Sequence, residues 1–154
     1  MSEHAILISI VEPSASSVTQ AWLESVARRV LEAEGVGTVE LSVTVTDDET
    51  VRSLNREYAG EDAVTDVLSF SQREGEEFAA PPGRIPPLGE VIIAYPQAAR
   101  QAREHGESPE AEVTRLLIHG ILHLLGYDHA QPEEERRMRT REEELAGGVS
   151  AGPS

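Results

Sequence analysis

Three of the chain's five histidines, His119, His123 and His129, lie in one short segment. The spacing of four between the first two places both imidazoles on one face of a helix, where they can share a metal ion. Gly126 follows within one turn, and a glycine can adopt a positive φ angle and end the helix. The chain can then double back and bring His129 to the same point. The segment therefore predicts a metal site with three imidazole ligands.

The ligand set favours a single catalytic zinc ion per chain. Three neutral imidazoles leave the fourth position of a tetrahedral zinc ion to water, and zinc lowers the pKa of that water from about 16 towards about 7. A structural zinc site normally has four protein ligands, often cysteines, and this chain has no cysteine. The adjacent Asp128 is a candidate for orienting a ligand histidine, or for bonding backbone amides of the turn.

The same spacing, H-x3-H-x2-G-x2-H, is that of the metzincin metalloproteases. Their general base is a glutamate directly after the first histidine, and this chain has Gly120 at that position. Without that carboxylate, no local group takes a proton from water during peptide hydrolysis. A zincin-type metallopeptidase is therefore an alternative that the motif suggests and the missing glutamate weakens.

The rest of the chain predicts one mixed α/β domain, α/β or α+β, over residues 1–146, with a flexible tail over 147–154. Apolar alternation predicts four strands, and periodic apolar residues with caps and helix-stopping glycines predict about five helices. The loop over 73–87 is rich in Glu, Gly and Pro. The strands are expected near 6–10, 39–45, 66–71 and 88–94, and the helices over 18–35 (capped within Ser14–Ser17), 46–58 (a capping box of Thr46 and Glu49), 96–106, 108–125 and from Pro132.

Composition restricts the class of protein. The length of 154 residues suits one domain, and the absence of cysteine excludes disulfides and thiolate sites. The net charge is −15, from 28 acidic and 13 basic residues, which argues against non-specific binding to nucleic acid and against DNA as a partner. The first apolar run is short and lacks a preceding basic region, so we expect no signal peptide, no membrane association and a cytoplasmic protein.

Three segments together resemble the bacterial YbeY family of rRNA maturation endoribonucleases. His119-Gly120 through His129 is similar to that family's HGxLHLxGYDH signature. Leu54-Asn55 through Tyr58, followed by Thr65 to Phe70, resembles its LNxxYRxxDxPTDVLSF stretch, and Leu88 to Ile93 resembles its LGDIxI strand. The order and separation of the segments also agree, so the resemblance extends from about Ile6 to Leu145.

The resemblance implies a zinc-dependent, single-strand-specific endoribonuclease that acts in 3′ end maturation of 16S rRNA, ribosome biogenesis and ribosome quality control. It implies a zincin-like fold with a small mixed sheet and the zinc at the end of a central helix. The implied partners are rRNA, a small-subunit ribosomal protein and an assembly GTPase. Cleavage proceeds either by water or by the 2′-OH, and the residues do not decide between them.

The chain departs from the family pattern where an arginine normally follows the tyrosine, because Ala59 occupies that position. Ala63-Val64 also replaces the usual Lys-Pro. Arg56, one turn earlier, is a candidate substitute for the missing arginine, or a solvated helix residue. These losses favour a second alternative, a ribosome-assembly binding factor with a mainly structural zinc. No general base is identified.

Several other polar residues have two interpretations. Thr65, Asp66 and Ser69 either line the cleft or stabilise the start of the strand. Arg115 either faces a phosphate or pairs with Glu112 on its own helix. His4 and His105 lack metal spacing and are expected on the surface.

Overall fold

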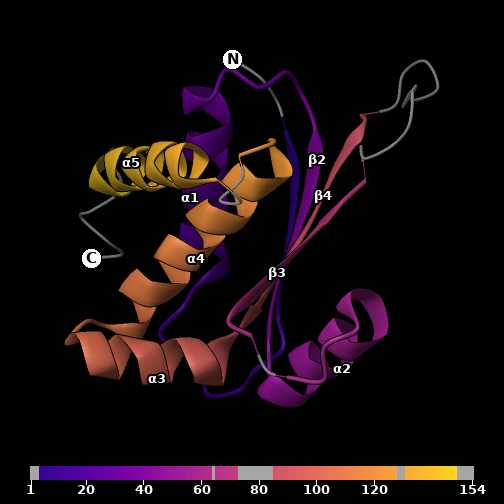
Figure 1. Ribbon diagram of the computed structural model, residues 1–154, viewed down its shortest axis with the longest axis vertical. Coiled ribbons are helices and arrows are strands. Elements are labelled where there is room, and N and C mark those ends of the chain that lie inside the picture. The colour runs from indigo at the N-terminus through magenta and orange to yellow at the C-terminus, as the bar shows by residue number, and fades with distance from the viewer. Residues whose placement is uncertain (1–3, 64, 73–84, 128–130, 149–154) are drawn as a thin grey trace.

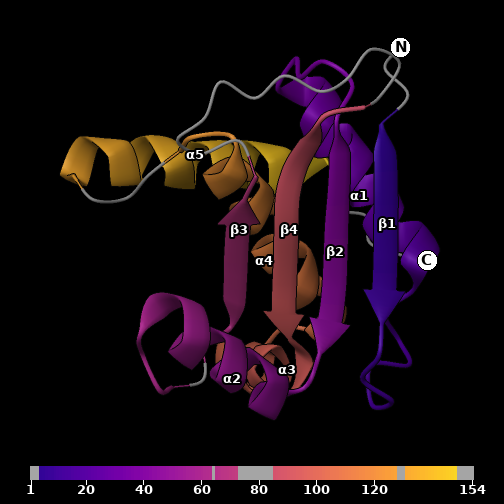
Figure 2. The same cartoon turned by 90° about the vertical axis from the view of Figure 1, so that its right-hand side faces the viewer.

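The computed structural model describes residues 4–63, 65–72, 85–127 and 131–148. Its centre is a four-stranded sheet of order β1-β2-β4-β3 (Figure 2). The central strands β2 and β4 are parallel, β1 is parallel to β2, and the edge strand β3 is antiparallel to β4. The bounds are β1 (Ala5–Ile10), β2 (Glu40–Thr46), β3 (Val67–Ser71) and β4 (Pro87–Ala94).

Four of the five helices in the described residues lie on one face of the sheet, and α2 lies on the other face, beside the start of β3 (Figure 1 and Figure 2). Helix α4 occupies the middle of the helical layer and contacts α1, α3 and α5 as well as β3 and β4. The bounds are α1 (Gln20–Ala33), α2 (Asp48–Ala59), α3 (Tyr95–His105), α4 (Pro109–Leu124) and α5 (Pro132–Gly148).

The hydrophobic core lies between the helical layer and the sheet. Strand β4 contributes buried residues to both faces, as its nearly continuous apolar sequence predicts. On one face Val91 and Ile93 join the main core, whereas Ile92 and Ala94 pack with Val51 of α2 on the other. The mixed α/β class, the four strands and the five helices agree with the prediction from sequence.

Two predicted helix starts are wrong. Helix α1 is capped by Thr19, whose side chain accepts a hydrogen bond from the Trp22 amide at 3.1 Å, not from within Ser14–Ser17. Ser14 instead donates its hydroxyl to the Glu12 carboxylate at 2.6 Å within a turn. Helix α2 is capped by Asp47, not by the Thr46–Glu49 box, because Thr46 is buried and still belongs to β2.

The predicted boundaries of the last elements also shift. Helix α5 extends through Gly148 and so includes the first two residues of the segment expected to be a flexible tail. Strand β4 begins at Pro87, the last residue of the expected loop, whose residues 73–84 lie outside the described part of the chain. No helix among the described residues has the length and apolar character needed to cross a membrane.

Candidate metal centre

His119 and His123 lie one turn apart near the end of α4, as predicted. Their rings are parallel, with an angle of 4° between the ring planes and 6.5 Å between the centroids. Both side chains are accessible to solvent, whereas most neighbouring residues of the helix are buried. The helix therefore presents two imidazoles side by side on one face, at the spacing of four residues at which two histidines can share a metal ion.

Glu142 of α5 fixes the first of these rings. Its Oε2 lies 2.5 Å from Nδ1 of His119, and its side chain is only 16% exposed. When Nδ1–H donates to a carboxylate, the ligating lone pair of the imidazole is on Nε2. A carboxylate behind a histidine is the usual partner of a metal ligand in proteins. Glu142 was not predicted from the sequence, although Met138 and Leu145, both buried, mark the inner face of α5 next to it.

Gly120, the residue after His119, packs directly against the sheet. A Cβ atom on Gly120 would lie 2.7 Å from Cγ1 and 3.1 Å from Cγ2 of Val91. Ser69 of β3 donates its hydroxyl to the Gly120 carbonyl at 3.2 Å. Ser69 thus joins the edge strand to α4, and Gly120 allows the helix to approach β4 closely.

The end of α4 confirms the predicted helix stop. Gly126 has a φ angle of +103°, its amide donates to the His123 carbonyl, and the Tyr127 amide donates to the Leu122 carbonyl at 3.0 Å. These two bonds form a Schellman motif, which turns the chain sharply. His129 and Asp128 lie outside the described residues, and within those residues no three His, Asp or Glu side chains converge as a metal site. The three-histidine set stays a prediction.

Arg56, the other candidate from sequence, lies on the exposed surface of α2. Its Nη1 is 3.8 Å from Asp62, whereas Arg52 binds both oxygens of the same carboxylate, at 2.8 and 3.3 Å. The hydrogen bond from Arg52 lowers the pKa of Asp62. Asp62 is therefore mainly the partner of Arg52, and Arg56 is only loosely held.

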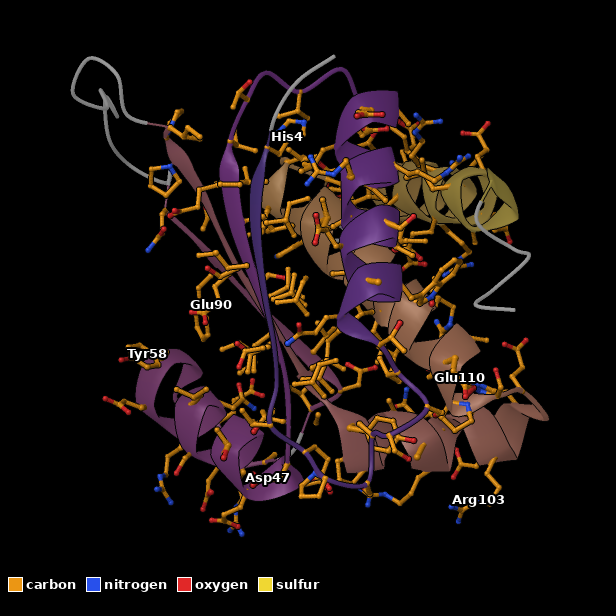
Figure 3. The ribbon with its side chains drawn as sticks, turned by 180° about the vertical axis from the view of Figure 1, so that it is seen from behind. His4, Asp47, Tyr58, Glu90, Arg103 and Glu110 are labelled. Carbon is orange, nitrogen blue, oxygen red and sulfur yellow. The ribbon has the colours of Figure 1, made fainter. Side chains whose placement is uncertain are left out.

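Tyr58, part of the family-like segment but given no role from the sequence, is the most exposed large aromatic side chain of the described residues, at 65% (Figure 3). It contacts Phe70 of β3 edge-on, with 5.4 Å between the ring centroids. In the sequence, Val51, Leu54 and Tyr58 recur at spacings of three and four, which places the Tyr58 ring on the apolar face of α2. This spacing was the signal that could have drawn attention to Tyr58.

A buried polar cluster links α3, α4 and the start of β3. Glu112 is fully buried and accepts hydrogen bonds from Arg115 and from Gln101, the latter at 2.8 Å. The Gln101 amide also donates to Asp66 at 3.2 Å. The Arg115–Glu112 pair is confirmed, and Asp66 stabilises the start of β3 through Gln101.

The expectation that His4 lies on the surface is wrong. His4 is 5% exposed, and its Nδ1 accepts a hydrogen bond from the Val39 amide at 3.2 Å. Burial, followed by the nearby Arg28 charge, lowers the pKa of His4, against an opposing effect of Glu32. His105 is exposed, as expected.

Comparison with known proteins identifies the family. Residues 8–149 match the family model described as Endoribonuclease YbeY. The chain is 46% identical over 131 residues to the Endoribonuclease YbeY of Symbiobacterium thermophilum, covering 82% of this chain and 84% of that protein. It is 45% identical over 142 residues to that of Aquifex aeolicus, covering 92% and 91%, and 40% identical over 153 residues to that of Roseiflexus castenholzii, covering 97% and 96%.

A solved structure agrees with this likeness. The solution structure of TM1509 from Thermotoga maritima superimposes with a TM-score of 0.60 and 25% identity, covering 95% of this chain and 92% of that one. The fold class predicted from sequence is thereby confirmed, and the sequence likenesses extend over the α4 segment and the β3–β4 pair. The chain belongs to the YbeY endoribonuclease family.

Proposed function

We propose that this chain is a zinc-dependent, single-strand-specific endoribonuclease that acts in 3′ end maturation of 16S rRNA and in ribosome quality control. The proposed site holds one zinc ion through His119, His123 and His129. Membership of the endoribonuclease YbeY family supports the reaction class and the RNA substrate. We further propose that the protein acts in the cytoplasm and that its partners include a small-subunit ribosomal protein and an assembly GTPase.

The observation that carries the proposal is the pairing of His119 with Glu142. The donor set fits zinc, because two parallel imidazoles lie one turn apart and the Nδ1 side of one ring faces a carboxylate 2.5 Å away. That carboxylate fixes both the tautomer and the orientation of the ring before a metal binds. Histidines that bind metals almost always have such a partner.

Zinc, when bound, supplies Lewis acidity that withdraws electron density from a phosphoryl oxygen or a water molecule. The chain's own residues position the RNA. The loosely held Arg56 can donate to a phosphate oxygen, since Asp62 is mainly bound by Arg52. Tyr58 presents an exposed ring on which an unpaired base can stack, a contact available in single strands. Asp128 is proposed to orient a ligand histidine.

The geometry around Gly120 disfavours the metallopeptidase alternative. A glutamate side chain at this position would start within 2.7 Å of Val91 and point into the sheet. The position therefore has neither the carboxylate of the metalloproteases nor room for it. The alternative of a ribosome-assembly binding factor rests on Ala59. The experiment below distinguishes it from the nuclease.

The test is zinc content and RNA cleavage by untagged protein, with His123→Ala as the variant and His105→Ala as the matched control. His105 is an exposed histidine on a different helix. We expect about one zinc ion per chain in the wild type and in the control, and loss of both zinc and cleavage in His123→Ala.

The outcomes separate the alternatives. If the wild type binds no zinc after zinc is supplied and excess removed, the proposed site is wrong. If His123→Ala unfolds, as judged by circular dichroism, the zinc is structural. If His123→Ala stays folded and the wild type binds zinc but cleaves no single-stranded RNA, the binding-factor alternative replaces the nuclease.

A further inference from the structure

Helix α5 and the turn after α4 line an open pocket that the proposed zinc site does not use. Its volume is about 380 Å³, and we call it the arginine pocket. Ligand sites in proteins have volumes of about 300–1,000 Å³, so the pocket has room for more than a single ion. It is lined by Tyr127, Arg136, Arg137, Thr140, Arg141 and Glu144.

The lining residues follow the periodicity of a helix. Arg137, Thr140, Arg141 and Glu144 recur at spacings of three and four and therefore share one face of α5. Tyr127 closes the pocket from the turn that follows α4, and its hydroxyl donates to Glu34 at 2.8 Å. The pocket thus lies where two elements meet and not on an isolated helix surface.

The three arginines of the pocket have different roles. Arg141 is paired with two carboxylates. It donates to Glu34 and, at 3.1 Å, to Glu144, and these hydrogen bonds raise its pKa. Arg136 and Arg137 form no ion pair with any carboxylate of the described residues. Arg141 therefore shapes the pocket, and Arg136 and Arg137 can bind a ligand.

Among the described residues neither arginine has an ion pair, although carboxylates lie within reach along the helix. Glu133 precedes Arg137 by four residues, which is the favourable order for a helical ion pair. The neighbouring Arg139 does form such a pair, with Glu135 at 2.9 Å. Two exposed guanidinium groups thus line a pocket in a chain whose net charge is −15.

We propose that the arginine pocket binds a phosphate group of single-stranded RNA, which rests on the proposed nuclease function. Guanidinium groups bind phosphate through paired hydrogen bonds, and the Thr140 hydroxyl offers a further donor. An acidic protein that binds RNA needs a local site where phosphates meet positive charge, because binding energy from the phosphate backbone depends on neutralising it.

The position of the pocket links it to the metal centre. Glu142, which contacts His119, directly follows Arg141 on α5. Consecutive residues of a helix point about 100° apart, so the pocket and the His119 contact occupy neighbouring faces of one rigid element. A phosphate held in the pocket would anchor the RNA chain on the same helix that orients the metal ligand.

The test compares the double variant Arg136→Gln/Arg137→Gln with the control Arg103→Gln/Arg139→Gln in the zinc-loaded protein. Both remove two positive charges, but Arg139 lies outside the pocket and Arg103 lies on α3, at the other end of the helical layer (Figure 3). A third variant, Arg136→Lys/Arg137→Lys, keeps the charges and removes the planar forks. Circular dichroism and thermal melting verify that each variant folds.

The first measurement is binding of a fluorescein-labelled 2′-O-methyl oligouridylate by anisotropy at several salt concentrations, with the probe's integrity checked on a gel. We expect the pocket variant to lose affinity about tenfold or more, and its salt slope to fall by about one. The lysine variant should keep the slope and lose part of the affinity, and the control should match the wild type. Equal affinity in pocket variant and wild type, or an equal loss in the control, would overturn the proposal.

The second measurement separates this proposal from the nuclease function. Uridine 3′,5′-bisphosphate should raise the melting temperature of the wild type and of the control, but not of the pocket variant. If that pattern holds while the wild type fails to cleave RNA, the pocket stands and the proposed function is wrong. If the wild type cleaves RNA but the bisphosphate stabilises the wild type and the pocket variant equally, or stabilises neither, the pocket assignment is wrong.

Discussion

At the scale of single residues, Glu142 contacts His119, one of the three proposed metal ligands. It makes this contact from a different helix, and its side chain is largely buried there. A carboxylate in this position keeps the imidazole ring in one orientation and one tautomer. The strength of metal binding should therefore depend on a residue that does not touch the metal.

We predict that Glu142→Ala weakens zinc binding about 10- to 100-fold, the usual effect of removing such a partner. Glu142→Gln should have a smaller effect, because the amide oxygen still accepts the Nδ1 hydrogen bond. Competition with a chromophoric chelator measures both affinities. The exposed neighbour Glu143 gives the control, since Glu143→Ala removes one charge from the next residue of α5. Equal affinities in Glu142→Ala and Glu143→Ala would contradict the assigned role.

The sequence could predict His119 and His123 but not Glu142, for a physical reason. The two histidines are neighbours through the helix periodicity alone, which is local. Glu142 becomes a neighbour only when α5 folds back onto α4, and its sequence context is a run of charges typical of an exposed helix face. The same limit applies to Gln101, which joins Glu112 and Asp66 from a third element.

At the scale of elements, the contact between α4 and the sheet depends on the lack of a side chain at Gly120. Val91 is fully buried in β4 and cannot move far, because its neighbours fill the core. The helix lies close enough for Ser69 to reach the Gly120 carbonyl. A larger residue would push α4 away from β3 and β4 and shift the histidines that it carries.

We predict that Gly120→Ala destabilises the protein by about 1–3 kcal/mol through overpacking, reduced by up to about 1 kcal/mol because alanine favours the helix. Chemical denaturation of zinc-free protein measures the change. The double variant Gly120→Ala/Val91→Ala should lose less than the sum of the two single variants, since the smaller residue makes space for the new methyl group. Gly147→Ala is the control, because a Cβ there meets nothing within 4 Å. Additive losses in the double variant would refute the close contact.

Element types were predictable, and so were the starts of α4 after Ser108 and of α5 at Pro132, whereas the starts of α1 and α2 were not. Apolar periodicity along a strand or helix is a property of each segment, so all four strands and five helices were expected. Several neighbouring polar residues could cap each helix, and the one that does so is decided by where the preceding element ends and by which side chains are already hydrogen-bonded. Ser14 is engaged by Glu12, and Thr46 stays in β2, so Thr19 and Asp47 become the caps.

At the scale of the whole molecule, the strand order β1-β2-β4-β3 could not be read from the sequence. Strand β4 separates β2 from β3 although β3 precedes it in the chain, and this depends on the pairing of segments far apart. The antiparallel edge strand and the parallel centre are likewise properties of pairing. His4 was misassigned for the same reason, because its partner Val39 comes from just before the neighbouring strand β2.

The burial of His4 makes the stability of the whole fold depend on pH. Its pKa in the folded state lies below the ordinary value of 6.5, mainly because burial disfavours the charged ring and secondly because of Arg28. The unfolded chain therefore binds more protons near and below that value, and stability increases with pH there. The stabilisation by neutral His4 is complete above about pH 6.5 and is lost as the pH falls through the lower, folded-state pKa.

We predict that lowering the pH from about 7.5 to 5 reduces the free energy of unfolding more in the wild type than in His4→Gln. The glutamine amide can still accept from the Val39 amide but does not titrate in this range. Urea denaturation of zinc-free protein at several pH values gives both curves, and the remaining histidines and the acidic groups contribute equally to each. Their difference isolates His4, whose protonation removes the acceptor for Val39 and places a positive charge beside Arg28. Parallel curves would mean that His4 titrates alike in the folded and unfolded chain, and that its burial does not couple the first strand to proton binding.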